Sequence, residues 1–261
     1  MSRPGSMPKL LAVAFVVACC VAPVSPVRAQ RLDFSAPALL NSNAQVETRS
    51  DLQPCVRYGG GVWVCAWHSD DSLGGALDFD ADILFAVSDN DGVAWSAAEA
   101  LNATAAGDLG DDLSPRLATD GAGRWVAVWF SADDLDGAID FDADILRAWS
   151  ADNGATWSAV RPLNTTAFTD GGEDELPRIA TDRAGHWVAV WQSLEDLEET
   201  VGGDYDIFAA RSTDGGATWT APQVLDGYAF EDTSSDVRPD IATDGDGLWL
   251  CVWETDDELG I

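Results

Sequence analysis

Short segments recur along the chain in which both the odd and the even positions are apolar, so that a β-strand there would have two apolar faces. In one of them, Trp125, Ala127 and Trp129 would point to one face of a β-strand. Val126 and Val128 would point to the opposite face, so such a strand belongs in a sheet that is covered on both sides. No segment has the roughly 3.6-residue periodicity of an amphipathic helix. The pattern therefore predicts an all-β chain.

A repeat of 62 residues organises these segments. Eleven of the twelve tryptophans fall on three repeat positions, and Trp149 is the exception. A fixed step over four units excludes a β-sandwich, and a parallel β-helix would need shorter repeats. The repeated tryptophans are Trp63, Trp125, Trp187 and Trp249; Trp67, Trp129, Trp191 and Trp253; and Trp95, Trp157 and Trp219.

Each unit contains four predicted strands. In the second unit they are expected at residues 116–119, 124–129, 144–149 and 157–163. Four antiparallel strands per unit, with faces that only neighbouring units can cover, are typical of the blades of a β-propeller. The fold class predicted from the sequence is therefore a β-propeller of four-stranded antiparallel blades.

The repeat positions divide the chain into blades. We expect blade 1 at residues 54–102, blade 2 at 115–164, blade 3 at 177–226 and a partial blade 4 at 239–261. Residues 30–41 match the end of a unit and are expected to form an orphan outer strand. About three and a half blades would leave sheet edges open. We therefore expect that further C-terminal blades, or an oligomer, close the ring.

Residues 1–29 are predicted to be a secretory signal peptide. They combine a positively charged start, an apolar run at residues 10–22 and a small-residue cleavage site. The alternative is a lipoprotein anchor through Cys19 or Cys20. No other long apolar stretch occurs, so we predict a secreted or extracytoplasmic chain, in the periplasm or at the cell surface, without a membrane span.

The expected mature chain is strongly acidic. Removing the signal leaves 11 basic and 45 acidic residues, a net charge of −34. Such a charge argues against nucleic acid or an anionic membrane as a partner, and it is compatible with cation binding. Cys55 and Cys65 flank a glycine-rich turn and are placed to face each other across a hairpin, which would leave Cys251 over.

An eight-residue pattern, S-x-D-x-G-x-T-W, precedes the last predicted strand of two units. Residues 88–95 are a degenerate copy, with Asn90 in place of the aspartate and Ala94 in place of the threonine. The chain resembles the Asp-box (BNR) repeat proteins, which include sialidases and non-enzymatic propellers. The resemblance implies that the boxes are structural and lie away from an active site. The two full matches are Ser150, Asp152, Gly154, Thr156 and Trp157, and Ser212, Asp214, Gly216, Thr218 and Trp219.

Alternating aspartates precede the third predicted strand of each unit. Because alternate residues of an extended segment share one side, their carboxylates are candidate ligands for a hard cation such as calcium. The competing interpretation is a solvated acidic loop. Asn102 and Asn164 also share a repeat position, and we assign them to turn formation. The candidate ligands are Asp78, Asp80 and Asp82; Asp140, Asp142 and Asp144; and Asp204 and Asp206.

Three functions remain open, of which the third is that of a purely structural extracellular repeat protein. The first is a secreted module that binds a glycan, an extracellular protein or cations, without evident catalysis. The second follows from the resemblance and is an exo-α-sialidase-type glycoside hydrolase with an incomplete site. Its candidate residues are Arg116, Arg178 and Arg238, for a substrate carboxylate, and Tyr228, as nucleophile. Repeated arginines argue against a catalytic site, since such a site uses unique residues from different blades.

Overall fold

The computed structural model describes residues 39–41, 49–78, 80–102, 105–197, 201–227, 229–230 and 233–256. The predicted signal peptide, most of the predicted orphan strand and Tyr228 lie outside these residues. Within the described ranges every regular element is a β-strand, as the alternation predicted. No helix in this part of the chain is long and apolar enough to cross a membrane.

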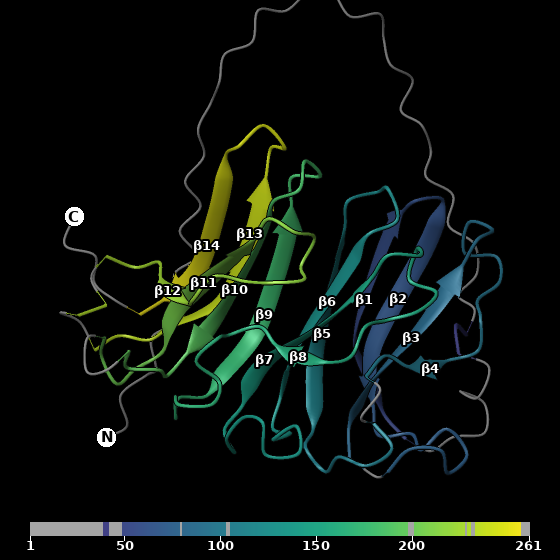
Figure 1. Cartoon of the computed structure of the whole chain (residues 1–261), viewed down its shortest axis with the longest axis horizontal. Helices are drawn as coiled ribbons and strands as arrows, with labels where there is room; N and C mark the ends of the chain where they lie inside the picture. The colour runs from purple at the N-terminus through teal and green to yellow at the C-terminus, as the bar shows by residue number, and fades with distance from the viewer. Residues whose placement is uncertain are drawn as a thin grey trace, which may run out of the picture. The chain divides into compact units, whose positions relative to one another are not determined.

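Fourteen strands form four antiparallel sheets in the order of the sequence (Figure 1). Three sheets have four strands each, and β13 pairs with β14 alone. The first strands of successive sheets, β1, β5, β9 and β13, pack beside one another. The strands are β1 (Asp51–Gly59), β2 (Val62–Ser69), β3 (Asp82–Ser88), β4 (Glu99–Ala100), β5 (Asp112–Thr119), β6 (Trp125–Ser131), β7 (Asp144–Ser150), β8 (Arg161–Pro162), β9 (Asp174–Thr181), β10 (Trp187–Ser193), β11 (Asp206–Ser212), β12 (Gln223–Val224), β13 (Asp236–Thr243) and β14 (Trp249–Thr255).

The outer strand of each complete blade is shorter than the sequence predicts. In blade 2 only Arg161 and Pro162 pair with β7, whereas we expected residues 157–163. Ser158 interrupts the ladder, because its hydroxyl as well as its amide bonds Trp149. Proline also has no amide to donate to a further partner. A strand this short leaves little edge for pairing with another chain.

Each inner strand carries a bulge next to the repeat proline. The residue before that proline has a positive φ in all four units, at Gln53, Ser114, Leu176 and Arg238. The bulge turns its amide toward the preceding blade: Ser114 donates to Nδ1 of His68 (3.4 Å), and Arg238 donates to Oε1 of Gln192 (3.0 Å). The bulges therefore link adjacent blades by hydrogen bonds.

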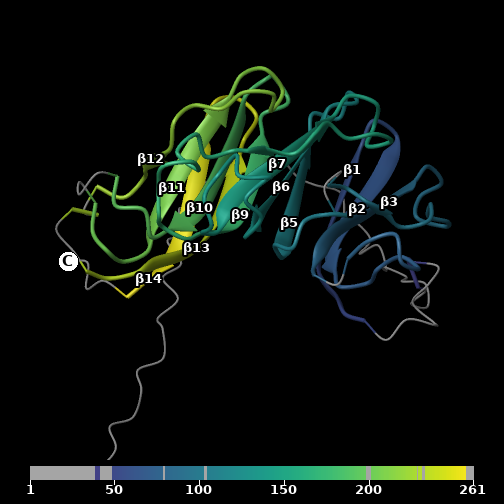
Figure 2. The same cartoon turned by 60° about the horizontal axis from the view of Figure 1, so that its bottom comes forward.

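The cores lie between blades and use both faces of each sheet (Figure 2). Trp125, Ala127 and Trp129 of blade 2 pack against apolar residues of blade 1. Val126 and Val128, on the opposite face, pack against blade 3. The expectation of apolar contacts on both faces is confirmed, and Trp125, Trp129, Trp187 and Trp191 are the largest of the fully buried side chains.

The cysteines of blade 1 are not paired with each other. Cys55 lies opposite Ala66 in the β1–β2 ladder, and Cys65 lies opposite Val56, so the two are displaced by one position. Both are buried free thiols, and the partly buried Cys251 packs with Val190 between blades 3 and 4. The β1–β2 register thus replaces the expected pairing across the hairpin.

One serine and one aspartate hold the turn before the outer strand. In blade 2, Thr156 donates its amide and its hydroxyl to the two carboxylate oxygens of Asp152, at 2.9 and 2.6 Å. Ser150 donates its hydroxyl to the same carboxylate (2.7 Å) and accepts the amide of Gly154 (2.9 Å). Ser212, Asp214, Gly216 and Thr218 make the same contacts in blade 3. Trp157 and Trp219 follow these turns and pack on the cores.

Replacing Asp214 by alanine is expected to lower the free energy of unfolding by about 1 kcal/mol at pH 7, since an exposed acceptor of three hydrogen bonds is lost. Burial alone would raise its pKa, but hydrogen bonds from Thr218 and Ser212 lower the pKa of Asp214 to about 2. A depressed pKa stabilises the fold above the unfolded pKa and ceases to do so as the pH falls through the folded one.

The difference in stability between wild type and Asp214→Ala should therefore shrink between about pH 4 and pH 2. Denaturant unfolding at a series of pH values measures it. Asp89→Ala, at an exposed carboxylate in the degenerate turn of blade 1 whose backbone φ is not positive, is the matched control and should cost much less. A difference that stays constant down to pH 2 would contradict the assigned role of the carboxylate.

Candidate functional sites

The third strand of one blade and the first strand of the next begin at the same place. The amide of Asp174 donates to the carbonyl of Ala143, the residue before β7, at 2.6 Å. Asp112 and Asp236 make the same contact at the neighbouring junctions. Asp144, the first residue of β7, is thereby brought close to Asp174, the first residue of β9.

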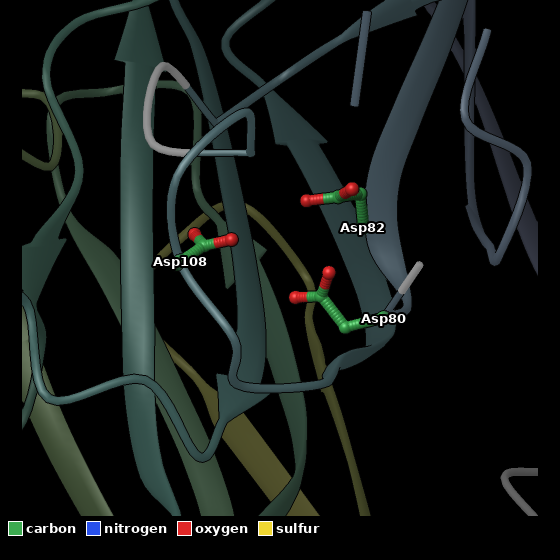
Figure 3. A group of neighbouring side chains, drawn as sticks. All are labelled: Asp80, Asp82 and Asp108. Atoms are coloured by element: carbon green, nitrogen blue, oxygen red, sulfur yellow. The ribbon is translucent and has the colours of Figure 1, made fainter. Parts of the chain in front are cut away.

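Carboxylates converge at each of these junctions. In every group, one ligand atom from each residue lies within 4.8 Å of the others. Figure 3 shows the group of blade 1, in which the carboxylates of Asp80, Asp82 and Asp108 face a common space. The other groups are Asp140, Asp142 and Asp170; Asp144, Asp170 and Asp174; and Asp206, Asp226 and Asp236.

The sequence located one or two of the three residues in each group. Six of the eight predicted ligands fall in these groups, whereas Asp78 and Asp204 belong to none of those found among the described residues. The partners from the inter-blade segments, such as Asp108 and Asp170, were not predicted. Their 62-residue spacing is a signal that could have found them.

An asparagine lies at the centre of two junctions. Asn164 is buried, and its Nδ2 donates to Asp144 (2.7 Å) and to Asp174 (2.8 Å), with Asp170 at 3.3 Å. Asn102 bonds Asp112 (2.7 Å) and Asp82 (3.3 Å) in the same way. The sequence assigned both asparagines to turns. In the structure each bridges carboxylates of two blades.

These carboxyl groups are buried, which raises their pKa. Burial, and then the charges of Asp170, Asp142 and Asp140, raise the pKa of Asp144 to about 8, although Asn164 opposes the rise. Burial likewise raises the pKa of Asp82 to about 7. The inter-blade aspartates Asp112 and Asp174 begin β5 and β9 as buried residues, because the strands extend three residues before the repeat proline.

The predicted arginines each have a partner nearby. Arg116 and Arg178 donate to the carbonyls of the prolines that precede them, at 2.8 and 3.0 Å. Arg238 pairs with Glu254 at 2.8 Å and occupies the repeat position before the proline, not after it. Burial, and then the charge of Arg116, lower the pKa of Arg178, so these two arginines lie near each other.

A tyrosine and a glutamate do lie together. The hydroxyl of Tyr205 donates to Oε2 of Glu175 at 3.4 Å, and Gln192 donates to the same oxygen at 3.0 Å. Burial, and then the charge of Glu175, raise the pKa of Tyr205. A hydroxyl bonded to a neighbouring carboxylate is also the arrangement in which a base activates a nucleophile, although the 3.4 Å distance is long for such a bond. Tyr228, the tyrosine predicted for that role, lies outside the described residues.

Two surface cavities lie on blade 2. The larger, about 760 Å³, is formed by the connection before β5 and the loop after β6, and exposed Leu109 and Phe141 stand beside Asp108 and Asp133. The smaller, about 480 Å³, lies between the outer strands of blade 2 and the turn of blade 3 at Ala217. Neither cavity is lined by Arg116 or Arg178.

The smaller cavity collects residues that depart from the repeat. Arg147 replaces Phe85 and Ala209 of the neighbouring blades, and Trp149 is the tryptophan outside the repeat positions. Arg161, also in the cavity, stands where blade 1 has a glutamate and blade 3 a glutamine. Two guanidinium groups therefore share one cavity, although the chain has only 14 basic residues against 45 acidic ones.

The guanidinium of Arg147 is held in place by one hydrogen bond and keeps an N–H donor without a partner among the described residues. Its Nη2 donates to the carbonyl of Ala217 at 2.8 Å, and its buried Nε has no partner among the described residues. Burial lowers the pKa of Arg147. Arg124 lies over the ring of Trp149, 4.1 Å from its centre, and donates to the carbonyl of Asp214. Arg161 makes no recorded hydrogen bond or ion pair with the described residues.

No protein-family model matches the sequence, and no curated protein matches it either. Among solved structures, a protein of unknown function from Dyadobacter fermentans has a TM-score of 0.54 at 17% identity, over 82% of this chain and 64% of its own. A Hadza microbial sialidase has a TM-score of 0.53 at 14% identity, over 78% and 42%. An α-L-arabinanase from Penicillium chrysogenum, solved with arabinobiose, has a TM-score of 0.47 at 19% identity, over 72% and 54%.

The likeness to the Dyadobacter protein and to the sialidase, whose TM-scores exceed 0.5, concerns the fold. It supports an architecture of repeated four-stranded antiparallel blades, and the solved neighbours include glycoside hydrolases of propeller fold. The chain spans 64% or less of the length of each of these solved proteins.

Proposed function

We propose that this chain is a secreted, Asp-box-type propeller module that binds an anionic carbohydrate and does not catalyse its hydrolysis. The cavity of Arg147, Trp149 and Arg161 carries the proposal, because it gathers residues that the repeat does not explain. Guanidinium groups recognise carboxylate and sulfate through paired N–H donors, and an indole offers apolar area beside them. The similar fold of a solved sialidase supports carbohydrate as the ligand class.

The hydrolase alternative has weaker support. The predicted arginines are each bonded to a neighbouring group, and Tyr228, the predicted nucleophile, lies outside the described residues. A glycosidase of this type needs an activated nucleophile and an arginine clamp at the same place. The recorded hydrogen bonds of Tyr205 and Glu175 include none to Arg116, Arg178 or Arg238, so binding is the function that the geometry supports best.

Replacing Arg161 by glutamine is expected to weaken the binding of an anionic saccharide about tenfold or more, because a hydrogen bond to a charged group is lost. Arg161 is an exposed residue of β8, so the change should leave the fold intact. Isothermal titration at physiological salt measures the dissociation constant. Glucuronic acid, glucosamine 6-sulfate and glucose serve as the carboxylated, sulfated and neutral probes.

Arg211→Gln is the matched control. Arg211 is an exposed strand arginine of blade 3, outside the cavity, and its loss changes the net charge by the same amount. If both variants weaken saccharide binding equally, the loss is due to the change in net charge and not to a contact in the cavity. Binding of glucose as tight as that of the charged sugars, or no binding of any probe at millimolar concentration, would contradict the proposal.

A further inference from the structure

Buried carboxylates at the blade junctions have too few donors. Asn164 offers two hydrogens from Nδ2, and three carboxylates lie within 3.3 Å of that nitrogen. Asp144 is fully buried, and its Oδ2 has no partner among the described residues. The amide oxygen of Asn164, also fully buried, has none either. Burying an ionised group without a partner costs several kcal/mol or forces it to take up a proton.

The same deficit recurs in the preceding junction. The amide oxygen of Asn102 has no partner among the described residues, and the residue is almost fully buried. A feature that returns at the same repeat positions is a property of the junction, not of one side chain.

Protein cations do not supply the missing charge. Among the described residues the recorded ion pairs are Arg49 with Asp70, Asp182 with His186, and Arg238 with Glu254. None of these six residues belongs to a carboxylate group at a junction. At the junction of blades 2 and 3 no recorded ion pair includes Asp144, Asp170 or Asp174, so their charge would be balanced by a solvent cation or by protonation.

We propose that the junctions between successive blades are calcium sites, each built from the start of a third strand, the following inter-blade segment and the start of the next blade. At the junction of blades 2 and 3 the ligands are Asp144, Asp170 and Asp174, with Asp140 and Asp142 beside them. The proposed site is separate from the cavity of Arg147, Trp149 and Arg161, and the proposal does not rest on the proposed function.

The ligand chemistry selects the ion. All the donors are oxygens, which suit hard cations, and the groups contain neither the histidine nor the cysteine that zinc or copper sites favour. Two oxygens bound to one Ca²⁺ at about 2.3–2.6 Å lie at most about 5 Å apart, and the observed limit of 4.8 Å meets this condition. Asn164 would supply a further oxygen by turning its amide over, since the O and N of an amide are assigned from its contacts.

Calcium at these sites would join blades that otherwise meet mainly through apolar faces. Asp144 belongs to blade 2, and Asp174 begins blade 3, so one ion would bind both. Asp170 lies in the segment between them and belongs to both groups of this junction. The bound ion therefore stabilises the relative placement of two blades as well as the loop.

The test is a calorimetric titration of Ca²⁺ into the full chain after treatment with EDTA and dialysis. We expect saturable binding of three equivalents, one for each junction, and a melting temperature that rises by on the order of 5 °C or more in millimolar Ca²⁺. Mg²⁺ at the same concentration should produce a smaller rise, since it keeps much of its hydration shell. No binding by the wild-type chain would overturn the proposal.

Asp170→Asn is the informative variant, because it removes a carboxylate shared by both groups at one junction and keeps the shape of the side chain. We expect it to lose one equivalent of Ca²⁺, or to weaken that site at least tenfold, and to lose part of the thermal shift. Asp136→Asn, at an exposed carboxylate in the loop of the same blade, is matched in shape and charge. Unchanged binding by Asp170→Asn, or equal weakening by both variants, would reduce the effect to general attraction by the acidic surface.

Asp144→Asn provides a second, opposite readout. In EDTA it should be at least as stable as wild type, because the amide is neutral and a buried carboxylate with an unpartnered Oδ2 is removed. In Ca²⁺ it should be less stable than wild type, since one ligand is missing. A variant that is less stable than wild type to the same extent in EDTA and in Ca²⁺ would assign Asp144 a structural role and contradict the calcium site.

Discussion

Truncation of Trp129 to alanine is expected to lower the free energy of unfolding by about 3–5 kcal/mol. The side chain is fully buried in the middle of β6 and packs in the core shared by blades 1 and 2. Its loss removes the transfer free energy of an indole and leaves a cavity, because sheets paired on both sides relax little. Apolar residues of both blades, including Phe85 and Leu146, would line that cavity.

Denaturant unfolding followed by far-UV circular dichroism measures this effect. Trp149→Ala is the matched control, since it removes the same side chain from the neighbouring strand of the same blade. Trp149 is only partly buried, so its loss should cost clearly less, in part through the contact with Arg124. Equal losses for the two variants would mean that the interface of blades 1 and 2 is not the main source of stability.

Replacing Gly172 by alanine is expected to destabilise the protein by about 1–3 kcal/mol. Gly172 lies in the segment between blades 2 and 3, and a Cβ at this position would overlap the backbone of Leu194 and Glu195. Backbone atoms cannot change rotamer to relieve the overlap, as a flexible side chain can. The inter-blade segment and the loop after β10 must therefore move apart. The same close approach occurs at Gly110, one repeat earlier, against Ala132 and Asp133.

The adjacent glycine provides a sharp control. A Cβ at Gly171 would meet nothing within 4 Å, so Gly171→Ala should be neutral or slightly stabilising through the unfolded chain. Thermal unfolding of the two variants in EDTA compares the folds without a bound cation. If Gly172→Ala unfolds at the same temperature as Gly171→Ala, the two loops are not in contact in solution.

The repeat shows how much of the candidate sites could be predicted from the sequence. Alternation of aspartates placed Asp80 and Asp82 on one side of an extended segment, and the structure groups them. It did not place Asp108 with them, because an inter-blade segment has no periodicity that indicates its direction. The arginine cavity was also missed, although Trp149 had been recognised as an exception to the repeat.

The sequence by itself determined the all-β class, the length of the repeating unit and the two apolar faces of each sheet. These features follow from side-chain alternation within a strand and from a constant step along the chain, and both can be read without coordinates. Only the tertiary structure decided which polar side chains meet. Asp144, Asn164 and Asp174 are 20 and 10 residues apart, and their contacts arise because one blade ends where the next begins. The structure likewise brings Arg147 and Arg161 into one cavity beside the turn of blade 3.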